Sequence, residues 1–286
     1  MNERSESGVS SIRPEDARGI IRRKAGLVSL PPSFVAFRNV EEIDVSDNCF
    51  TEEGCRMIGS FQYLTSLSLS GNQITDLPES FRNLTRLKEL DLTNNPMKSF
   101  PNVLRDLKSL EILWMRATPV ATIPEWIGEL TNLSKLYLER TGISRLPDEI
   151  TFLRKLTVLR ILNENLDCFP LQVTKMPGLN KLAVAACSLR EIPREIGLLR
   201  NLTDLNLSHN QLASIPPEIG QLANLIRLDM RNNKLVSLPE ELTHLTALED
   251  LDLYQNPIGN QTPELEAFLW RVSKAKILEK RCGKSE

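Results

Sequence analysis

The amino-acid sequence predicts an α/β solenoid, which is a stack of repeated strand-and-turn units around one continuous core. The main observation is a leucine that recurs at one constant interval, without an insertion, through most of the 286-residue chain. These leucines are Leu64, Leu87, Leu110, Leu133, Leu156, Leu179, Leu202, Leu225 and Leu248. The composition agrees, because 41% of the residues are apolar but only 5% are aromatic, as expected for many small and similar packing sites. A single unit could not bury its own leucines, so stability must come from stacking.

Each unit opens with the pattern L-x-x-L-x-L-x-x-N or a close variant, and residues 202–210 are a complete copy. Apolar residues with a period of two predict a short strand, and strands at a fixed spacing stack into a parallel sheet. The asparagine falls where the chain turns, where its side chain can bond backbone groups of neighbouring turns. An apolar-proline step such as Ile215-Pro216 then begins the return arm, because proline fixes φ.

A further unit with Val40, Ile43, Val45 and Asn48 precedes this series, and a half unit at residues 27–31 precedes that. The solenoid is therefore predicted over residues 27–258, as a half unit followed by about ten units. The first full unit differs in its return arm at residues 51–58.

These motifs resemble the leucine-rich repeat family, and the resemblance covers about residues 27–258. The 23-residue unit with Leu-Pro-x-x-Ile is similar to the intracellular subclass, which includes Ras-associated scaffold repeat proteins, plant intracellular Ras-group repeat proteins and bacterial repeat effectors. The resemblance implies a curved leucine-rich-repeat horseshoe with the parallel β-sheet on its concave side. Residues 51–58 look like the helical return arm of ribonuclease-inhibitor-type repeats, so we expect a helical turn there.

The open ends of a solenoid would expose leucine, so we expect a helical cap at both ends. Residues 1–11 are predicted to be a disordered tail and residues 12–26 an N-terminal cap helix, because acids follow Pro14 and basic residues come before Gly26. Residues 259–286 are predicted to form a C-terminal cap helix and a basic tail, with the helix starting at Thr262-Pro263. Its apolar stripe is expected to cover the last unit rather than bind a partner, and Trp270 lies off that stripe. The stripe consists of Leu265, Phe268, Leu269, Val272 and Leu278.

Composition and charge exclude several classes of function. Lys and Arg number 35 and Asp and Glu 37, so the net charge of −2 argues against non-specific nucleic-acid binding. The five cysteines are scattered and only two histidines are present, so neither a disulfide framework nor a zinc site is expected, and no cofactor or metal is predicted. The sequence shows no signal-peptide pattern and no apolar run of membrane-spanning length, so we expect a cytoplasmic protein without a membrane span.

The predicted binding surface is the column of residues that face solvent from the middle of each strand. Read at the interval of the repeat, this column holds acidic or polar side chains near its ends and Trp114, Tyr137 and Arg160 on consecutive strands in its middle. Trp, Tyr and Arg are the residue types most enriched at binding hot spots. The predicted protein-binding patch consists of Trp114, Tyr137, Arg160, Ile112, Val158 and Leu162.

Two alternatives are compatible with the same column. Its side chains could pack against one another without a ligand, for example with Arg160 stacked on Tyr137 by a cation–π contact. The acidic rims could instead steer a basic partner. These rims comprise Glu41, Glu42, Asp44 and Asp47 at one end and Glu249, Asp250, Asp252 and Tyr254 at the other.

The asparagine at the turn is missing from four consecutive units, which carry Thr118, Thr141, Glu164 and Cys187 instead. Threonine and cysteine can partly replace its hydrogen bonds. A carboxylate at this site would carry a poorly compensated charge. We therefore expect either local loosening of units 4 to 7 or a one-residue shift that places Asn163 or Asn165 in the turn, and this region could be a hinge or a binding site.

The sequence favours a non-catalytic protein–protein recognition module or scaffold that binds its partner on the concave face. The two histidines, His209 and His244, lie on opposite faces of neighbouring units, and no cysteine is placed near either for nucleophilic catalysis. By resemblance only, the setting is intracellular signalling and the partner is a small GTPase or a phosphatase, with the chain itself a monomer. The alternatives are a bacterial leucine-rich-repeat effector that is secreted into a host cell and binds a host protein, and an enzyme whose site is not recognised.

Overall fold

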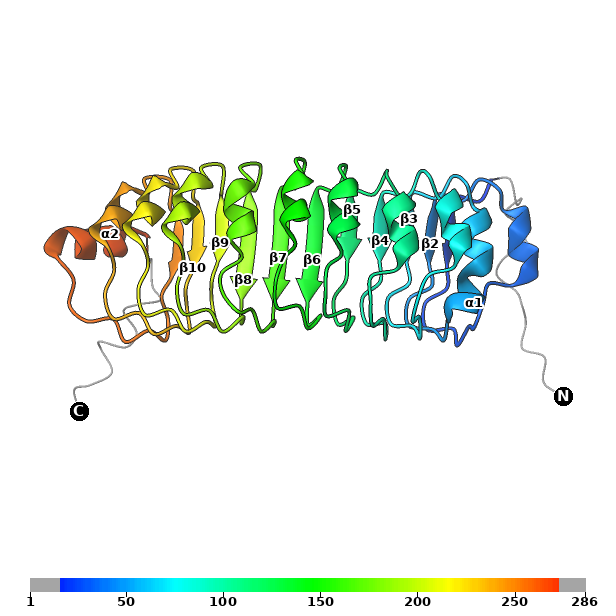
Figure 1. The fold of residues 1–286 in the computed structure, drawn as a ribbon, viewed down its shortest axis with the longest axis horizontal. Helices are drawn as coiled ribbons and strands as arrows, with labels where there is room; N and C mark the ends of the chain where they lie inside the picture. Colours follow the sequence, from blue (N-terminus) through cyan, green and yellow to red (C-terminus); the bar gives the residue numbers. More distant parts are fainter. Residues whose placement is uncertain (1–15, 273–286) are drawn as a thin grey trace.

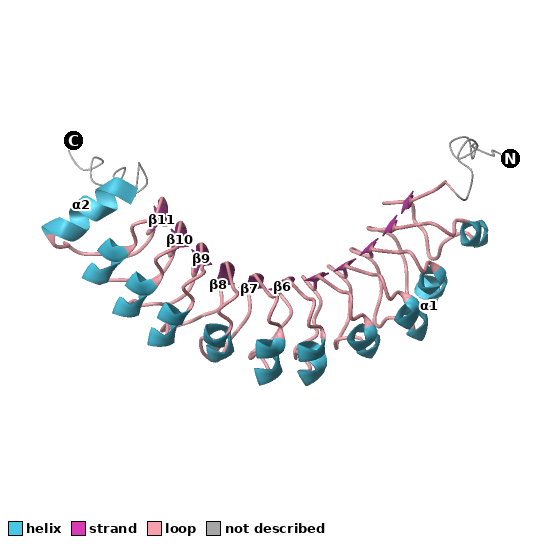
Figure 2. Cartoon of the chain, turned by 90° about the horizontal axis from the view of Figure 1, so that it is seen from above, coloured by secondary structure: helices cyan, strands magenta, loops and turns pink. Residues whose placement is uncertain are grey.

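The computed structural model describes residues 16–272, which form one curved arc of repeated units (Figures 1 and 2). Eleven short strands make a single parallel sheet, and each strand pairs with its neighbours in sequence. Seen from above, the strands line the inner side of the arc and short helices line its outer side (Figure 2). The predicted solenoid with a concave parallel sheet is therefore confirmed.

The elements alternate regularly along the chain. The strands are β1 (Gly19–Ile21), β2 (Glu42–Asp44), β3 (Ser66–Ser68), β4 (Glu89–Asp91), β5 (Ile112–Trp114), β6 (Lys135–Glu139), β7 (Val158–Leu162), β8 (Lys181–Ala185), β9 (Asp204–Asn206), β10 (Arg227–Asp229) and β11 (Asp250–Asp252). The return arms hold the 3-10 helices η1 (Pro32–Ala36), η2 (Arg56–Ser60), η3 (Glu79–Asn83), η4 (Asn102–Asp106), η5 (Glu125–Glu129), η6 (Asp148–Phe152), η7 (Leu171–Lys175), η8 (Arg194–Leu198), η9 (Pro217–Gln221) and η10 (Glu240–His244). The α-helices are α1 (Glu52–Cys55) and α2 (Pro263–Val272). None of the helices in residues 16–272 has the length and apolar character needed to cross a membrane.

The sheet keeps the register that the 23-residue repeat predicts. Leu67 lies beside Leu90, and Leu90 lies beside Leu113, so equivalent leucines form columns in the core. These three side chains are completely or almost completely buried. Burying one leucine contributes about 1.5–3 kcal/mol. The stack of units, rather than any one unit, therefore supplies the core.

The return arms are started by proline. A proline precedes each 3-10 helix from η3 to η10, and its carbonyl accepts the first hydrogen bond of the turn, as in the 2.9 Å bond from Phe81 N–H to Pro78 O. In the first full unit, the Thr51 hydroxyl accepts from Gly54 N–H and begins α1, which continues into η2. The helical turn expected at residues 51–58 is therefore confirmed.

The predicted N-terminal cap helix over residues 12–26 is wrong in its described part. Residues Gly19–Ile21 form strand β1, which pairs in parallel with β2. Ile20 lies beside Ile43 and is buried, so β1 extends the inner apolar column by one unit. Sheet hydrogen bonds and this burial outweigh the charge pattern that favoured a helix. Residues 1–15, including the predicted tail 1–11, lie outside the described residues.

At the other end, α2 lies where the sequence places the C-terminal helix, and it packs against η10 and β11. Leu265, Phe268 and Val272 of the predicted stripe are buried, whereas Trp270 is 68% exposed. Leu278 and the predicted basic tail lie outside the described residues.

Buried asparagines join neighbouring units at the turns, as expected. In Asn210, Oδ1 accepts from the N–H groups of Cys187 and Leu189, at 3.0 and 3.1 Å. Its Nδ2 donates to the carbonyls of Val184 and Leu207. One side chain thus satisfies backbone groups that are buried away from water.

The expected one-residue shift at Glu164 is wrong, whereas the alternative, local loosening of units 4 to 7, stays a prediction. Glu164 itself occupies the turn site and is 5% exposed, while Asn163 and Asn165 are exposed. Its carboxylate accepts hydrogen bonds from Thr141 N–H, Thr141 Oγ1 and Gly142 N–H, at 2.6, 2.9 and 2.7 Å. Three short donors replace the asparagine network, which explains why the chain does not need to shift. Strands β6, β7 and β8 are also longer than the others, at five residues each instead of three.

Candidate protein-binding surface on the concave face

The three residues predicted to form the centre of the site lie side by side on the concave face. Trp114 of β5 is the register partner of Tyr137 on β6, and Tyr137 is the partner of Arg160 on β7. All three side chains point away from the leucine core and are half-buried. Three consecutive strands therefore present one row of large side chains.

The three flanking residues are placed less evenly. Ile112 and Val158 share a row, but Lys135 of β6 lies between them. Leu162 lies beside Glu139 at the ends of β7 and β6. The apolar residues thus lie among charged ones. We call the concave-facing residues of β5 to β8, together with Arg116, the central patch. These are Ile112, Trp114, Arg116, Lys135, Tyr137, Glu139, Val158, Arg160, Leu162, Lys181, Ala183 and Ala185.

Trp114 and Tyr137 form a stacked aromatic pair. Their ring centroids are 5.6 Å apart and the rings are nearly parallel, with an interplanar angle of 6°. Such a pair contributes about 0.5–1.5 kcal/mol beyond the area that it buries. The pair is therefore held in place before any partner arrives, which lowers the entropic cost of binding.

The cation that covers Tyr137 is Arg116 and not Arg160. The Arg116 guanidinium carbon lies 5.2 Å from the Tyr137 ring centroid. Glu139 holds both arginines, with ion pairs of 3.3 Å to Arg116 and 3.6 Å to Arg160. The cation–π contact considered between Tyr137 and Arg160 is thus replaced by one from Arg116, which follows the end of β5.

Arg116 and Glu139 were not predicted from the sequence. They occupy the next solvent-facing column, two positions after Trp114 and Tyr137, so reading that column at the interval of the repeat would have found them. Arg116 Nε and Glu139 Oε1 are buried and form no hydrogen bond within the described residues. The ion pair between these two atoms, at 3.3 Å, is therefore poorly aligned and leaves hydrogen-bonding capacity unused.

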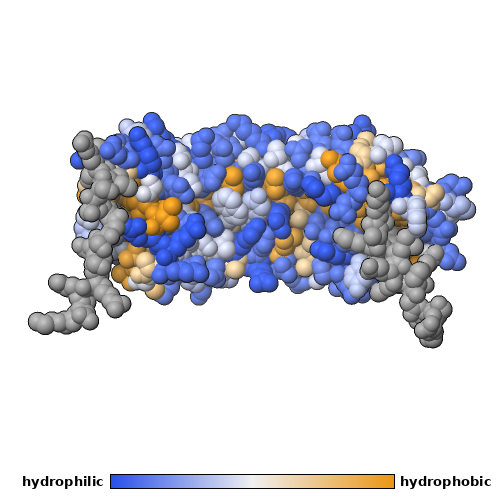
Figure 3. Space-filling model, turned by 180° about the vertical axis from the view of Figure 1, so that it is seen from behind, coloured by the Kyte–Doolittle hydropathy of each residue, from blue (hydrophilic) through white to orange (hydrophobic). Residues whose placement is uncertain are grey.

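A shallow groove runs from the central patch towards β11. Its volume is about 580 Å³. Its lining begins at Lys135 and Tyr137, passes Arg160 and Lys181, and ends at Asp252. Figure 3 shows a largely hydrophilic face with apolar residues in its middle and further apolar residues towards its two ends. A concave groove with a partly apolar floor and polar ends suits an extended ligand.

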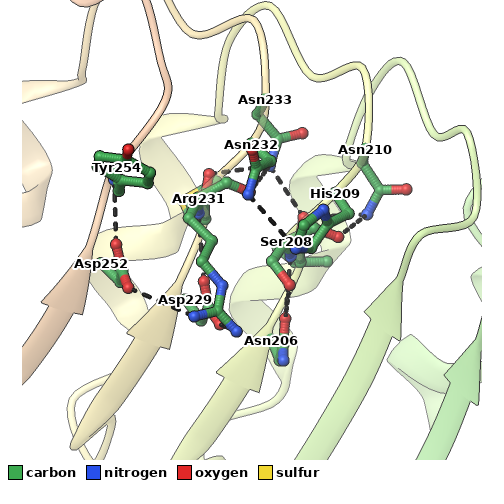
Figure 4. Close-up of polar contacts among 12 residues, drawn as sticks. Asn206, Ser208, His209, Asn210, Asp229, Arg231, Asn232, Asn233, Asp252 and Tyr254 are labelled. Carbon is green, nitrogen blue, oxygen red and sulfur yellow. Dashed lines mark hydrogen bonds and ion pairs between the residues drawn. The ribbon is translucent and has the colours of Figure 1, made fainter.

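The C-terminal end of the groove is a cluster of charged side chains (Figure 4). Arg231 pairs with Asp229 at 3.3 Å and with Asp252 at 3.8 Å. Burial raises the pKa of the Asp229 carboxyl, and the nearby negative charge of Asp252 adds to that shift, while Arg231 opposes it. His209 lies beside this cluster, with Nε2 3.3 Å from Asn232 Nδ2.

The two predicted acidic rims lie at opposite ends of the sheet, on or next to β2 and β11. At the first rim, Asp44 is bound by Arg23, so part of its charge is neutralised. Burial opposes ionisation of Asp44, but the hydrogen bonds from Arg23 and Ser46 outweigh it and lower the pKa of this carboxyl.

The thiols nearest the core are unsuited to nucleophilic chemistry. Burial raises the pKa of Cys55 to about 12 and that of Cys187 to about 11, so both remain protonated at neutral pH. Cys187 Sγ instead donates to the Ala185 carbonyl at 3.2 Å and fills the turn site, as the sequence indicated. Within residues 16–272 no group of three or more His, Cys, Asp or Glu side chains is arranged to hold a metal ion.

Three family models match the chain. They are a leucine-rich repeat region over residues 172–282, a leucine-rich repeat over residues 62–120, and a further leucine-rich repeat over residues 38–59. A comparison with curated protein sequences finds no match.

Solved structures agree with the family models. A leucine-rich repeat protein of Leptospira interrogans is 25% identical with a TM-score of 0.55, over 86% of this chain and 80% of that one. The ectodomain of the receptor kinase GASSHO1/SCHENGEN3 from Arabidopsis thaliana, in complex with CASPARIAN STRIP INTEGRITY FACTOR 2, is 28% identical with a TM-score of 0.68, over 82% of this chain and 32% of that one. The Arabidopsis receptor kinase HAESA, in complex with the peptide hormone IDA and the co-receptor SERK1, is 25% identical with a TM-score of 0.70, over 87% and 44% of the two chains.

The curved parallel sheet, the columns of buried leucine and the three family matches together define the class: this chain is a leucine-rich repeat protein. Its fold is that of a protein-interaction module, in which stacked repeats present an extended concave surface. The chain spans most of the Leptospira protein but less than half of either receptor chain.

Proposed function

We propose that this chain is a non-catalytic recognition module that binds a protein partner through the central patch of its concave face. The observation that carries this proposal is the stacked pair of Trp114 and Tyr137, which is half-buried and has Arg116 and Arg160 next to Tyr137. Rigid aromatic rings next to arginine are typical of binding hot spots, because they bury a large area at low entropic cost.

The similar receptor structures support binding of a peptide or protein. Two of them are complexes, one with CASPARIAN STRIP INTEGRITY FACTOR 2 and one with a peptide hormone and a co-receptor. We extend only this mode of recognition, the binding of a peptide or protein, to the present chain, because those receptors are much longer chains.

The finer assignment is to the intracellular 23-residue subclass, with a scaffold role in cytoplasmic signalling as a monomer. The unbroken 23-residue repeat with Leu-Pro-x-x-Ile supports it. A small GTPase or a phosphatase is the partner that this subclass suggests.

A second candidate function is that of a bacterial effector that is secreted into a host cell. The similarity to the Leptospira leucine-rich repeat protein favours it, because the two chains match over most of both lengths. The partner would then be a host protein, and the same patch would bind it.

Affinity capture tests the proposed surface. The wild-type chain is compared with Trp114→Ala/Tyr137→Ala/Arg160→Glu, using lysate of the source organism and of a candidate host, and the captured proteins are identified by mass spectrometry. The matched control is Phe152→Ala/Trp270→Ala/Arg194→Glu, which changes exposed residues of η6, α2 and η8. Thermal unfolding must be equal for the proteins compared.

Loss of a partner from the patch variant but not from the control is the expected result. Equal capture by all three proteins would reject the central patch as the binding surface.

A further inference from the structure

The concave face is divided by charge into three parts. The central patch carries four cations, Arg116, Lys135, Arg160 and Lys181, and one carboxylate, Glu139, which gives it a charge of 4 − 1 = +3. At the concave-facing positions of β2, β4, β9, β10 and β11, every charged residue except Arg227 is acidic, and β3 carries serine at these positions. The chain as a whole is slightly acidic, so this positive region is a local feature and not a consequence of composition.

The cations of the central patch are weakly paired. Lys135 forms no ion pair with any residue in the described part of the chain, although its side chain is half-buried between Ile112 and Val158. Lys181 approaches Asp204 only to 3.7 Å, and the Asp204 carboxylate also accepts hydrogen bonds from Arg227 and Thr203. Arg116 and Arg160 share the single carboxylate of Glu139.

Some acidic side chains on both sides are paired with arginine, whereas Glu42, Glu89, Asp91 and Asp250 form no ion pair within residues 16–272. On the C-terminal side Arg227 binds Asp204, and Arg231 binds both Asp229 and Asp252. On the N-terminal side Arg23 binds Asp44. A basic partner at the paired rim carboxylates would have to compete with these arginines. An acidic group over the central patch would meet Lys135, which has no ion pair within residues 16–272, and a surface with a net positive charge.

We infer that the central patch recognises a short acidic segment of its protein partner, with an aromatic or aliphatic side chain next to the acidic residues. This assignment rests on the proposed function and specifies the chemistry of the partner. Carboxylates would bind Lys135, Arg160 and Lys181, and the neighbouring apolar side chain would pack on the rings of Trp114 and Tyr137.

The width of the patch sets the length of this segment. Four parallel strands at about 4.8 Å spacing extend over about 14 Å. An extended chain advances about 3.3 Å per residue, so the acidic segment covers about four or five residues. Longer acidic stretches would reach Asp91 on one side or Asp229 on the other and be repelled.

Selection from a displayed library of random peptides tests this inference. Peptides of about twelve residues, long enough to cover the patch and both flanks, are selected on the immobilised full-length chain. Binding of the selected peptides is then measured by fluorescence anisotropy against Lys135→Glu/Lys181→Glu. The matched control is Lys98→Glu/Lys175→Glu, which reverses two exposed lysines outside the concave strands, one of them on η7.

The expected peptides contain about four or five residues rich in Asp and Glu beside an aromatic or aliphatic residue. Their affinity should fall at least about tenfold in Lys135→Glu/Lys181→Glu and by less than about twofold in the control. Enrichment of neutral or basic peptides, failure to enrich any peptide, or equal binding to the two lysine variants would overturn the assignment.

Trp114→Ala/Tyr137→Ala separates this inference from the proposed function. If the selected peptides lose binding to this variant but are not acidic, the proposed concave site stands and the acidic nature of the partner is rejected. Acidic peptides that bind this variant as tightly as the wild type would reject the aromatic site itself.

Discussion

The carboxylate of Glu164 accepts hydrogen bonds from both the backbone N–H and the hydroxyl of Thr141, one repeat earlier in the chain. This pair replaces the asparagine link found in most other units. Burial raises the pKa of the Glu164 carboxyl, although the hydrogen bonds from Thr141 and Gly142 oppose that shift. The site therefore holds a group whose charge is costly.

Replacement of Glu164 by asparagine should stabilise the protein near neutral pH. Asparagine removes the buried charge, and its amide N–H can donate to turn carbonyls, as Asn210 does to Val184 and Leu207. We expect a gain on the order of 1 kcal/mol in the free energy of unfolding, measured by urea denaturation. Glu191→Asn, which changes an exposed carboxylate, is the control and should have a negligible effect. An equal or lower stability of Glu164→Asn would contradict this interpretation of the turn.

The same carboxyl predicts a pH dependence. Because its pKa is higher in the folded than in the unfolded chain, the folded state binds the proton more tightly. The stabilisation from this tighter proton binding is complete below pH 4.5, the ordinary pKa of a glutamate carboxyl. It is lost as the pH rises through the folded-state pKa. The advantage of Glu164→Asn over the wild type should therefore increase from about pH 4 to about pH 8. A difference that stays constant over this range would show that the charge is not the cause.

The leucine columns should dominate stability. Leu136 is fully buried in β6, so Leu136→Ala should cost about 2–5 kcal/mol through lost burial and the cavity left behind. Leu198 at the end of η8 is 55% exposed, and Leu198→Ala should change stability by less than about 0.5 kcal/mol. Chemical denaturation of both variants checks the comparison, and equal losses would be inconsistent with the packing described.

The α2 helix should protect the last repeat. Leu265→Ala/Phe268→Ala removes two of its buried side chains, and we expect faster hydrogen exchange of β11 and a lower midpoint of thermal unfolding. Trp270→Ala on the exposed side of the same helix is the control. If exchange of β11 is the same in both variants, α2 does not act as a cap.

Close contact between neighbouring return arms requires glycine at position 128. A Cβ atom there would lie 2.6 Å from the Glu149 carbonyl oxygen of the next arm. Gly128→Ala should therefore destabilise the protein by about 1–3 kcal/mol. Gly178 leaves 3.4 Å to its nearest backbone oxygen, so Gly178→Ala should cost less. Thermal unfolding of the two variants measures the difference, and the reverse order would refute the contact.

The repeat made most of the fold predictable, because each strand inherits its register from its neighbours. Ile20 was misassigned since the terminal unit has a neighbour on one side only and its sequence no longer matches the repeat. Glu164 was misjudged because the sequence does not show that three donors converge on its carboxylate.

The candidate site was predictable as a column but not as a set of contacts. Trp114, Tyr137 and Arg160 are adjacent, as their spacing indicates. The stacking of Arg116 on Tyr137 depends on side-chain directions between two columns, and a single column does not contain that information.

The constant register from β2 to β11 spaces equivalent residues evenly along the concave face. Each strand adds about 4.8 Å to the distance along the column. No insertion changes the spacing from Asp91 through the aromatic pair to Asp229. For the proposed binding site, this spacing means that the intervals between the side chains of a partner matter for binding as well as their chemistry. Insertion or deletion of one whole unit would keep every leucine in its column and yet change the distance between the charged and aromatic residues of the concave face.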